Sequence, residues 1–309
     1  MLATARPRGH HHRISPRLPV PDVPRATAEP VIVLGMHRSG TSMLATLLAD
    51  AGLFLGHKVQ PGHQEAEFFQ HLNMYVLAES SADWDRPAGV ATMLADERAR
   101  RYLVDYLAMS VNSPRAISFL GSRRYLRHRS LGTLEIPWGW KDPRTTLTFP
   151  LWLDVFPRAK VIHVTRHGVD VARSLQLRYD KSIDAYVDRY RHRKGLYRFI
   201  ARRHHLTTGL RVASLDDGLD LWDDYVRAAH AAVTSLGDRA IEFRYEDFLE
   251  DPDPVMHRLL DFCNVAVAPD RSWSEQVQST RAFAYRQDPE LVAVAERHGE
   301  RLAGHGYSV

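Results

Sequence analysis

The residues between Gly35 and Gly40 form a loop whose composition and setting suit phosphate binding. The loop follows the β-branched run Val31 to Val33 and precedes a segment whose apolar residues recur at helical spacing. Such a strand–loop–helix unit points backbone N–H groups and the positive end of a helix dipole at one place. Four residues separate the two glycines, which is the spacing of a Walker A loop.

The residues that follow the loop depart from the Walker A motif, which continues with Lys and then Ser or Thr. Thr41 and Ser42 stand at these positions, and the basic residue lies inside the loop as Arg38. The lysine that nucleoside triphosphatases place on the β- and γ-phosphates is therefore missing. A phosphorylated ligand other than ATP is the better interpretation.

A second basic residue follows a second buried strand. Segment 159–165 (AKVIHVT) is typical of a strand, Arg166 comes directly after it, and Ser174 lies eight residues further on. Because ligands bind at the carboxyl ends of parallel strands, Arg166 is expected in the same crevice as the Arg38 loop. A guanidinium and a hydroxyl could hold a second phosphate. The alternative is that Arg166 pairs with Asp170 and Ser174 faces solvent.

The elements that position these residues alternate between strands and helices. This alternation predicts an α/β fold with a parallel sheet and helices on both faces. The expected strands are 31–33, 138–141, 159–165 and 240–244. The expected helices, besides the one after the loop, are 65–78, 94–109, 145–155, 168–177, 183–203, 222–236, 254–264 and 289–304. No repeat or linker divides the chain, so residues 30–309 are expected to form one domain behind a disordered tail, residues 1–29.

Composition limits the class of protein. With 44% hydrophobic residues in 309, the chain can bury an ordinary core. No apolar run approaches about eighteen residues, so no transmembrane segment is expected. The single cysteine, Cys263, excludes an internal disulfide and fits a reducing, cytoplasmic location. The net charge of +4 is modest, and no basic motif with interleaved aromatics indicates a nucleic-acid partner.

Together, the stretch HRSGTS and the Arg166–Ser174 pair resemble the sulfotransferase superfamily of the cytosol and Golgi. In that superfamily a P-K-S-G-T or P-R-S-G-T loop binds the 5′-phosphosulfate of PAPS (3′-phosphoadenosine 5′-phosphosulfate). An Arg after a strand, with Ser eight residues later, binds its 3′-phosphate. The stretch YEDFLEDP, 245–252, resembles a further family segment. The resemblance spans 30–264 and implies a P-loop NTPase-like fold of three layers.

The resemblance also implies roles for individual residues. The 5′-phosphosulfate would lie among His37, Arg38, Ser39, Gly40, Thr41 and Ser42, and the 3′-phosphate beside Arg166 and Ser174. Arg38 takes the place of the family's loop lysine and would stabilise the leaving bisphosphate by its charge, because a guanidinium does not give up a proton. No metal is expected, since fixed cations perform its task.

The base that accepts the acceptor's proton is also assigned by resemblance. Small-molecule sulfotransferases use a His in a K-x-H stretch, and 140–144 has none. Heparan-class enzymes use a Glu in E-x-H-F-F and a Lys in K-x-P. HQEAEFFQ and WKDPR resemble these, which implies Glu65 as base and Lys141 beside the sulfonate. Glu67 replaces the family's His. The two glutamates lie two apart on an expected helix, so at most one faces the acceptor.

Alternatives stay open at this point. The glutamates could instead complement a helix dipole, and Lys141 could form a structural ion pair. The family's late R-K-G stretch is absent, and Arg281 or Arg286 could replace it. The expected activity is transfer of sulfonate from PAPS to a hydroxyl or amine of a glycan, glycolipid or small molecule. A P-loop kinase acting on a small metabolite and a non-catalytic anion-binding module are the alternatives.

Overall fold

A parallel sheet forms the centre of the computed structural model, which describes residues 29–200, 209–277 and 281–308. Its four described strands are β1 (Val31–Leu34), β2 (Gly139–Lys141), β3 (Lys160–Thr165) and β4 (Ala240–Arg244), in the order β2-β1-β3-β4. The predicted tail, residues 1–29, lies outside the described residues except for Glu29.

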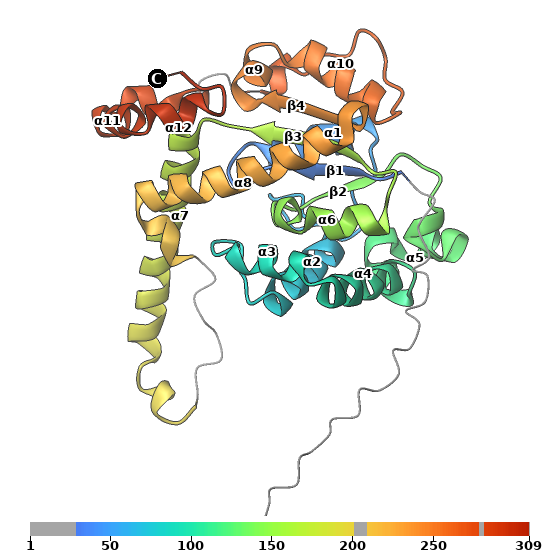
Figure 1. Cartoon of the computed structure of the whole chain (residues 1–309), viewed down its shortest axis with the longest axis horizontal. Helices are drawn as coiled ribbons and strands as arrows, with labels where there is room; N and C mark the ends of the chain where they lie inside the picture. The colour runs from blue at the N-terminus through green and yellow to red at the C-terminus, as the bar shows by residue number, and fades with distance from the viewer. Residues whose placement is uncertain (1–28, 201–208, 278–280, 309) are drawn as a thin grey trace, which may run out of the picture.

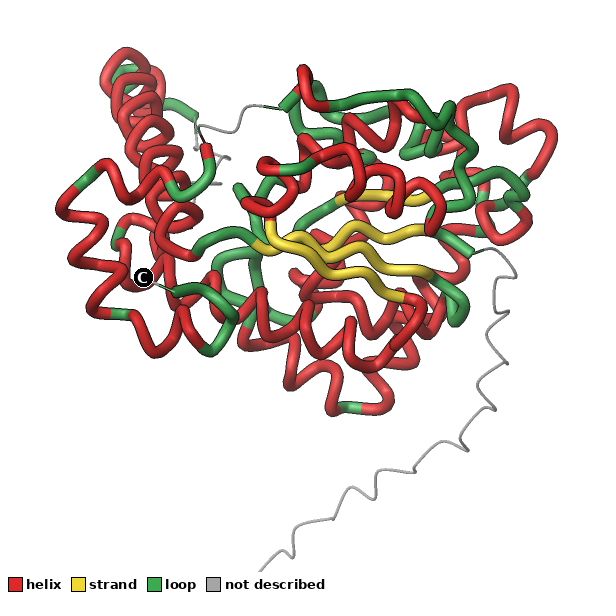
Figure 2. Tube along the Cα trace, turned by 90° about the horizontal axis from the view of Figure 1, so that it is seen from above, coloured by secondary structure: helices red, strands yellow, loops and turns green. Residues whose placement is uncertain are grey.

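Helices cover both faces of this sheet (Figures 1 and 2). The core on one face includes α1 (Thr41–Ala51), α9 (Tyr245–Glu250) and α10 (Pro252–Phe262). The core on the other face includes α2 (Glu67–Glu79), α3 (Ala88–Ala95), α4 (Glu97–Val111), α5 (Ile117–His128), α6 (Thr145–Val155), α7 (Gly168–Arg193), α8 (Leu215–Leu236), α11 (Pro289–Arg297) and α12 (Gly299–Ala303). The predicted α/β fold of three layers is confirmed.

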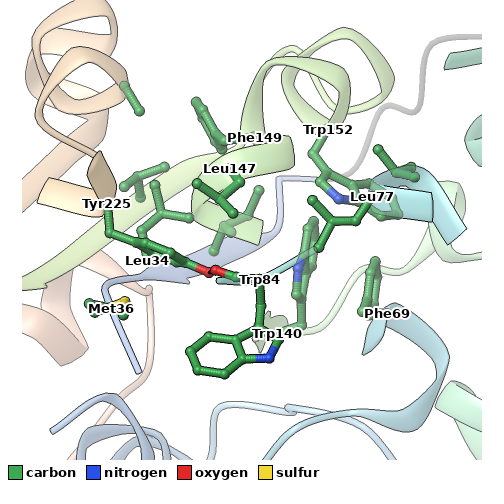
Figure 3. Packing of buried hydrophobic residues seen from close by; sticks show 14 of the residues in the cluster. Leu34, Met36, Phe69, Leu77, Trp84, Trp140, Leu147, Phe149, Trp152 and Tyr225 are labelled. Carbon is green, nitrogen blue, oxygen red and sulfur yellow. Dashed lines mark hydrogen bonds between the residues drawn. The ribbon is translucent and has the colours of Figure 1, made fainter. Parts of the chain in front are cut away.

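Alternation along the strands builds these two cores. Val31 and Val33 of β1 pack against one layer of helices, whereas Ile32 and Leu34 pack against the other. Because both faces are buried, the strand is apolar throughout rather than alternately polar. The larger core contains several aromatic residues, and the Phe69 ring stacks on Trp140 with centroids 3.9 Å apart (Figure 3).

Several predicted boundaries are confirmed and others are wrong. Helix 145–155 and strand 240–244 have the predicted ends. Helices 168–177 and 183–203 are instead one helix, α7, which continues to Arg193 because the intervening sequence contains no Pro or Gly. The end of the second prediction, 201–203, lies outside the described residues.

Other differences between the predicted and observed helix boundaries lie near the predicted site. Helix 65–78 begins at Glu67 with Ala66 as its N-cap, so Glu65 lies in the preceding loop and not on the helix. The predicted helix 94–109 is instead parts of two helices, α3 and α4, which are separated by Asp96. The Asp96 carboxylate caps α4, because it accepts hydrogen bonds from the amides of Arg98 and Ala99. Helix α5 was not among the predicted elements.

The strand register brings the functional segments together. Leu34 of β1 pairs with His163 of β3, so the loop after β1 and the turn after β3 are neighbours. On the other side of β1, Val33 pairs with Lys141, the last residue of β2. Thus the carboxyl ends of β1, β2 and β3 meet at one edge of the sheet. Within the described chain, no helix is both long and apolar enough to span a membrane.

Candidate active site

The loop after β1 depends on two glycines with positive φ. Gly35 has φ +146°, and a Cβ there would lie 2.6 Å from the carbonyl oxygen of Val164. Gly40 has φ +89°, and its Cβ would lie 2.3 Å from the Tyr245 ring. The Gly35 amide donates to Thr146 Oγ1 at 3.0 Å, which joins the loop to α6. Gly40 also precedes α1, whose first turn has no side-chain cap and no acidic residue. The positive end of this helix is therefore available to an anion.

Arg38 links this loop to helix α7. Its backbone has φ +71°, and its Nε donates to Ser174 Oγ at 2.8 Å. Its carbonyl oxygen accepts from Arg166 Nη1 at 3.2 Å. Burial lowers the pKa of Arg38, and the nearby cations Arg166 and Arg281 lower it further. The structure therefore brings the two predicted phosphate-binding elements into direct contact.

The Arg166 guanidinium contacts an aromatic ring, a backbone carbonyl and a carboxylate. Its guanidinium lies 4.9 Å from the centroid of the Tyr245 ring, and Nη2 donates to the carbonyl of Arg281 at 3.1 Å. Nη2 also lies 3.5 Å from Asp170 Oδ2. The Asp170 pair considered as an alternative is therefore present. Ser174, which that alternative placed toward solvent, is half-buried and accepts a hydrogen bond from Arg38.

Lys141 and Glu65 form a buried ion pair beside the loop. Lys141 Nζ lies 3.1 Å from Glu65 Oε1 and donates to Ser42 Oγ at 3.1 Å. Glu65 Oε2 accepts from Gln70 at 3.0 Å and lies 3.5 Å from Arg144. Burial lowers the pKa of Lys141, although the charge of Glu65 opposes this shift. The pair connects the first turn of α1 with the end of β2.

These groups line a cavity of about 390 Å³. The predicted residues on its walls are His37, Arg38, Gly40, Thr41, Ser42, Glu65, Lys141 and Arg166. Among the described residues, Ser39 and Ser174 are not part of the lining, and Ser39 is buried within the loop. Glu67 is in the first turn of α2 and is likewise not part of the described lining.

The two late arginines differ in position. Arg281 lines the cavity, and its carbonyl oxygen accepts the hydrogen bond from Arg166. Arg286 is not part of the described lining and lies over the Phe283 ring, 4.4 Å from its centroid. Only Arg281 is therefore placed with the predicted phosphate-binding groups.

Arg178 and Tyr245 are among the further lining residues that the sequence did not reveal. Arg178 follows Ser174 by four residues on α7, so helical spacing from Ser174 was the available signal. Its guanidinium lies 4.8 Å from the centroid of the Trp84 ring. Tyr245 was noted only as part of YEDFLEDP, and the structure places its ring against Gly40 and Arg166.

His37 contributes a neutral ring to the same wall. The imidazole packs edge-on against Trp84 and Tyr225, with centroids 4.9 and 6.3 Å away. Burial lowers the pKa of His37 well below its ordinary value, and the charges of Arg144 and Arg178 add to this effect. The His37 imidazole therefore adds no positive charge to the cavity at neutral pH. Within the described ranges, no group of three or more His, Cys, Asp or Glu could hold a metal ion.

Comparisons with known proteins place the chain among sulfotransferases. A sulfotransferase from Alicyclobacillus acidocaldarius is 16% identical over 91% of this chain and 97% of its own, with a TM-score of 0.46. The sulfotransferase domain of the Synechococcus PCC 7002 olefin synthase is 18% identical over 86% of each chain, with a TM-score of 0.41. No curated protein gives a significant match. Residues 30–269 match the model of the Sulfotransferase family, and the chain therefore belongs to that family.

Proposed function

We propose that the enzyme transfers the sulfonate group of PAPS to a hydroxyl or amine of a glycan, glycolipid or small-molecule acceptor. The observation that carries this proposal is the 2.8 Å hydrogen bond from Arg38 to Ser174. This bond joins the Arg38 loop to the helix that follows Arg166, so two cationic elements meet at one cavity. Two such elements suit PAPS, because PAPS has two phosphate groups separated by its ribose. A ligand with a single phosphate would need only the loop.

The residues suit the two ends of PAPS. The amides of residues 37–42, with the side chains of Arg38, Thr41 and Ser42, are proposed to hold the 5′-phosphosulfate. Arg166 and Ser174 are proposed to hold the 3′-phosphate. Arg281 is the better candidate to complete that subsite, because it lines the cavity and Arg286 does not.

The proposed reaction is an in-line displacement at sulfur. The acceptor oxygen forms a bond to sulfur while the bond from sulfur to the 5′-phosphate oxygen breaks, and its electron pair leaves with 3′,5′-bisphosphoadenosine (PAP). The acceptor's proton passes to Glu65, which lines the cavity, whereas Glu67 does not. Lys141 contacts both Ser42 and Glu65, so its charge can stabilise the sulfonate group during its transfer. Arg38 is proposed to stabilise the negative charge on the leaving phosphate.

Ligand-induced stabilisation tests this function, because a ligand bound only by the folded state raises the melting temperature. We expect PAP to raise it more than ATP or magnesium-ATP, and this effect to weaken in Arg166→Ala. Arg101→Ala is a control, since Arg101 pairs only with Glu97 on the exposed side of α4 among the described residues. Equal or greater stabilisation by magnesium-ATP would favour the kinase alternative and contradict the proposal.

A further inference from the structure

Arg178 is a cationic residue of the cavity that the proposed reaction does not use. It lies on α7, lines the cavity, and places its guanidinium over the Trp84 ring. Within residues 29–200, 209–277 and 281–308, no carboxylate lies within ion-pair distance of it. Two neighbouring arginines do have carboxylate partners, Arg166 with Asp170 and Arg144 with Asp142. Arg178 therefore has donor capacity that the described chain leaves unused.

Arg178 follows Ser174 by one turn of α7, but it contacts a different aromatic residue from Arg166 of the proposed 3′-phosphate subsite. Arg166 lies over the Tyr245 ring and donates to the backbone carbonyl of Arg281. Arg178 instead lies beside Trp84, whose ring also contacts His37. Burial lowers the pKa of Arg178, and the cations Arg38 and Arg144 lower it further, while Glu65 opposes them. Of these neighbours, Arg144 lies 3.5 Å from Glu65, the proposed base, and Glu65 and Arg178 line the same cavity. The acceptor must bind beside that base.

The cation–π contact with Trp84 does not occupy the N–H donors of the Arg178 guanidinium. A guanidinium over an aromatic ring uses its flat face for the cation–π contact, while its N–H groups point outward in its plane. Those N–H groups match the two oxygens of a carboxylate or sulfate, which they can bind in bidentate fashion. Removal of part of its hydration by burial strengthens such a pair when an anion arrives.

We propose that Arg178, supported by Trp84, binds an anionic oxygen group of the acceptor, a carboxylate or a sulfate ester, while the reacting hydroxyl faces Glu65. This inference rests on the proposed sulfotransferase function, since it assigns the acceptor half of that site. Among the glycan, glycolipid and small-molecule acceptors that the sequence left open, it selects an acidic one, such as an acidic sugar.

The test uses the full chain saturated with PAP and two probes that differ in charge, 4-hydroxybenzoate and 4-hydroxybenzamide. Calorimetric titration is carried out on the wild type, Arg178→Met and Arg173→Met. Arg173 lies on the same helix and bonds to Gln176, and it is not part of the described cavity lining, so it is the matched control. We expect the wild type and Arg173→Met to bind the benzoate about tenfold more tightly than the benzamide, as a charge-assisted pair predicts. Arg178→Met should lose this preference.

The outcomes separate this inference from the proposed function. If the wild type binds both probes equally, or Arg178→Met retains the preference, the inference is overturned. It is also overturned if Arg178→Met weakens PAP binding by about tenfold at an unchanged melting temperature, because Arg178 would then belong to the nucleotide half. If the wild type does not bind PAP, the proposed function itself fails. Should Arg178→Met melt early, Arg178→Gln replaces it, since glutamine is uncharged but keeps a polar side chain.

Discussion

Arg38 donates a hydrogen bond to Ser174 across 136 residues of sequence, and this contact joins the loop after β1 to the helix after β3. A second contact, from Arg166 Nη1 to the Arg38 carbonyl at 3.2 Å, joins the same two elements through the backbone of the loop. Because Arg38 bonds to Ser174, a shift of α7 must alter the position of the loop guanidinium. The proposed 5′ and 3′ subsites are therefore mechanically linked before any ligand binds.

Ser174→Ala tests this link. The substitution removes the hydroxyl that orients Arg38 and that we assign to the 3′-phosphate, so PAP affinity should fall about fivefold, corresponding to about 1 kcal/mol for one hydrogen bond. Calorimetric titration with PAP measures the effect. Ser182→Ala is the matched control, because its hydroxyl bonds to the backbone of the same helix. An unchanged affinity in Ser174→Ala, or an equal loss in both variants, would count against the assignment.

Gly40→Ala tests the shape of the loop. The positive φ of an L residue costs about 1–2 kcal/mol, and overlap of the new methyl with the Tyr245 ring should add about 1–3 kcal/mol. Gly306→Ala introduces only the first cost, since no atom lies within 4 Å of its Cβ position. Urea unfolding should therefore show the larger loss in Gly40→Ala, together with lost PAP binding. Similar losses in both variants would mean that the Tyr245 contact is not limiting.

A matched pair of substitutions, Glu65→Gln and Glu67→Gln, tests the base. Loss of a general base typically slows a reaction by about 10²–10⁴-fold. We expect this loss only in Glu65→Gln, with PAP affinity retained, because Glu65 reaches the cavity and Glu67 does not. Transfer of radiolabelled sulfonate from PAPS to a panel of hydroxyl acceptors provides the measurement. If Glu67→Gln is the slow variant, the assignment is reversed.

The buried imidazole of His167 should make the folded protein less stable in acid. Burial lowers its pKa to about 4, with further contributions from Arg286 and Arg166. The unfolded chain therefore binds a proton below pH 6.5 that the folded chain excludes until about pH 4, so stability falls as the pH drops through this window. The loss from this residue alone should be about 2 kcal/mol at pH 5.

His167→Phe isolates that contribution. A phenyl ring can keep the stacking on Tyr285, whose centroid lies 4.2 Å from that of the imidazole, and it does not titrate. The difference in unfolding free energy between pH 7 and pH 5 should shrink in this variant. It should not change in His192→Gln, which alters an exposed residue of α7. An undiminished acid loss in His167→Phe would show that other groups cause it.

Local sequence signals predicted much of the fold because they act over short distances. The β-branched run before Gly35 produces β1, and the predicted helix 145–155 lies between Pro143 and Pro157 and has the predicted ends. The loop motif placed most of the proposed nucleotide contacts at the cavity for the same reason, since strand, loop and helix are consecutive.

Tertiary contacts explain what the sequence did not predict. Glu65 lies outside α2 because the segment before the helix bonds back to itself, with the Gln60 amide donating to the Glu65 carbonyl at 2.8 Å. Arg178 shares a face of α7 with Ser174, but which face meets the cavity depends on how the helix is rotated against β3 and α8. The spacing of residues along the helix does not determine that rotation. The same limit concealed the role of Tyr245, which depends on strand β4 lying beside β3.

The bond from the Gly35 amide to Thr146 has a consequence for ligand association. Together with the contact from Arg166 to the Arg38 carbonyl, it fixes the loop from two neighbouring segments while φ of Arg38 remains left-handed. The conformational entropy of this loop is therefore lost during folding and not during binding. A preorganised loop of this kind should bind its anion with little rearrangement, so association should approach the rate set by diffusion and electrostatic attraction.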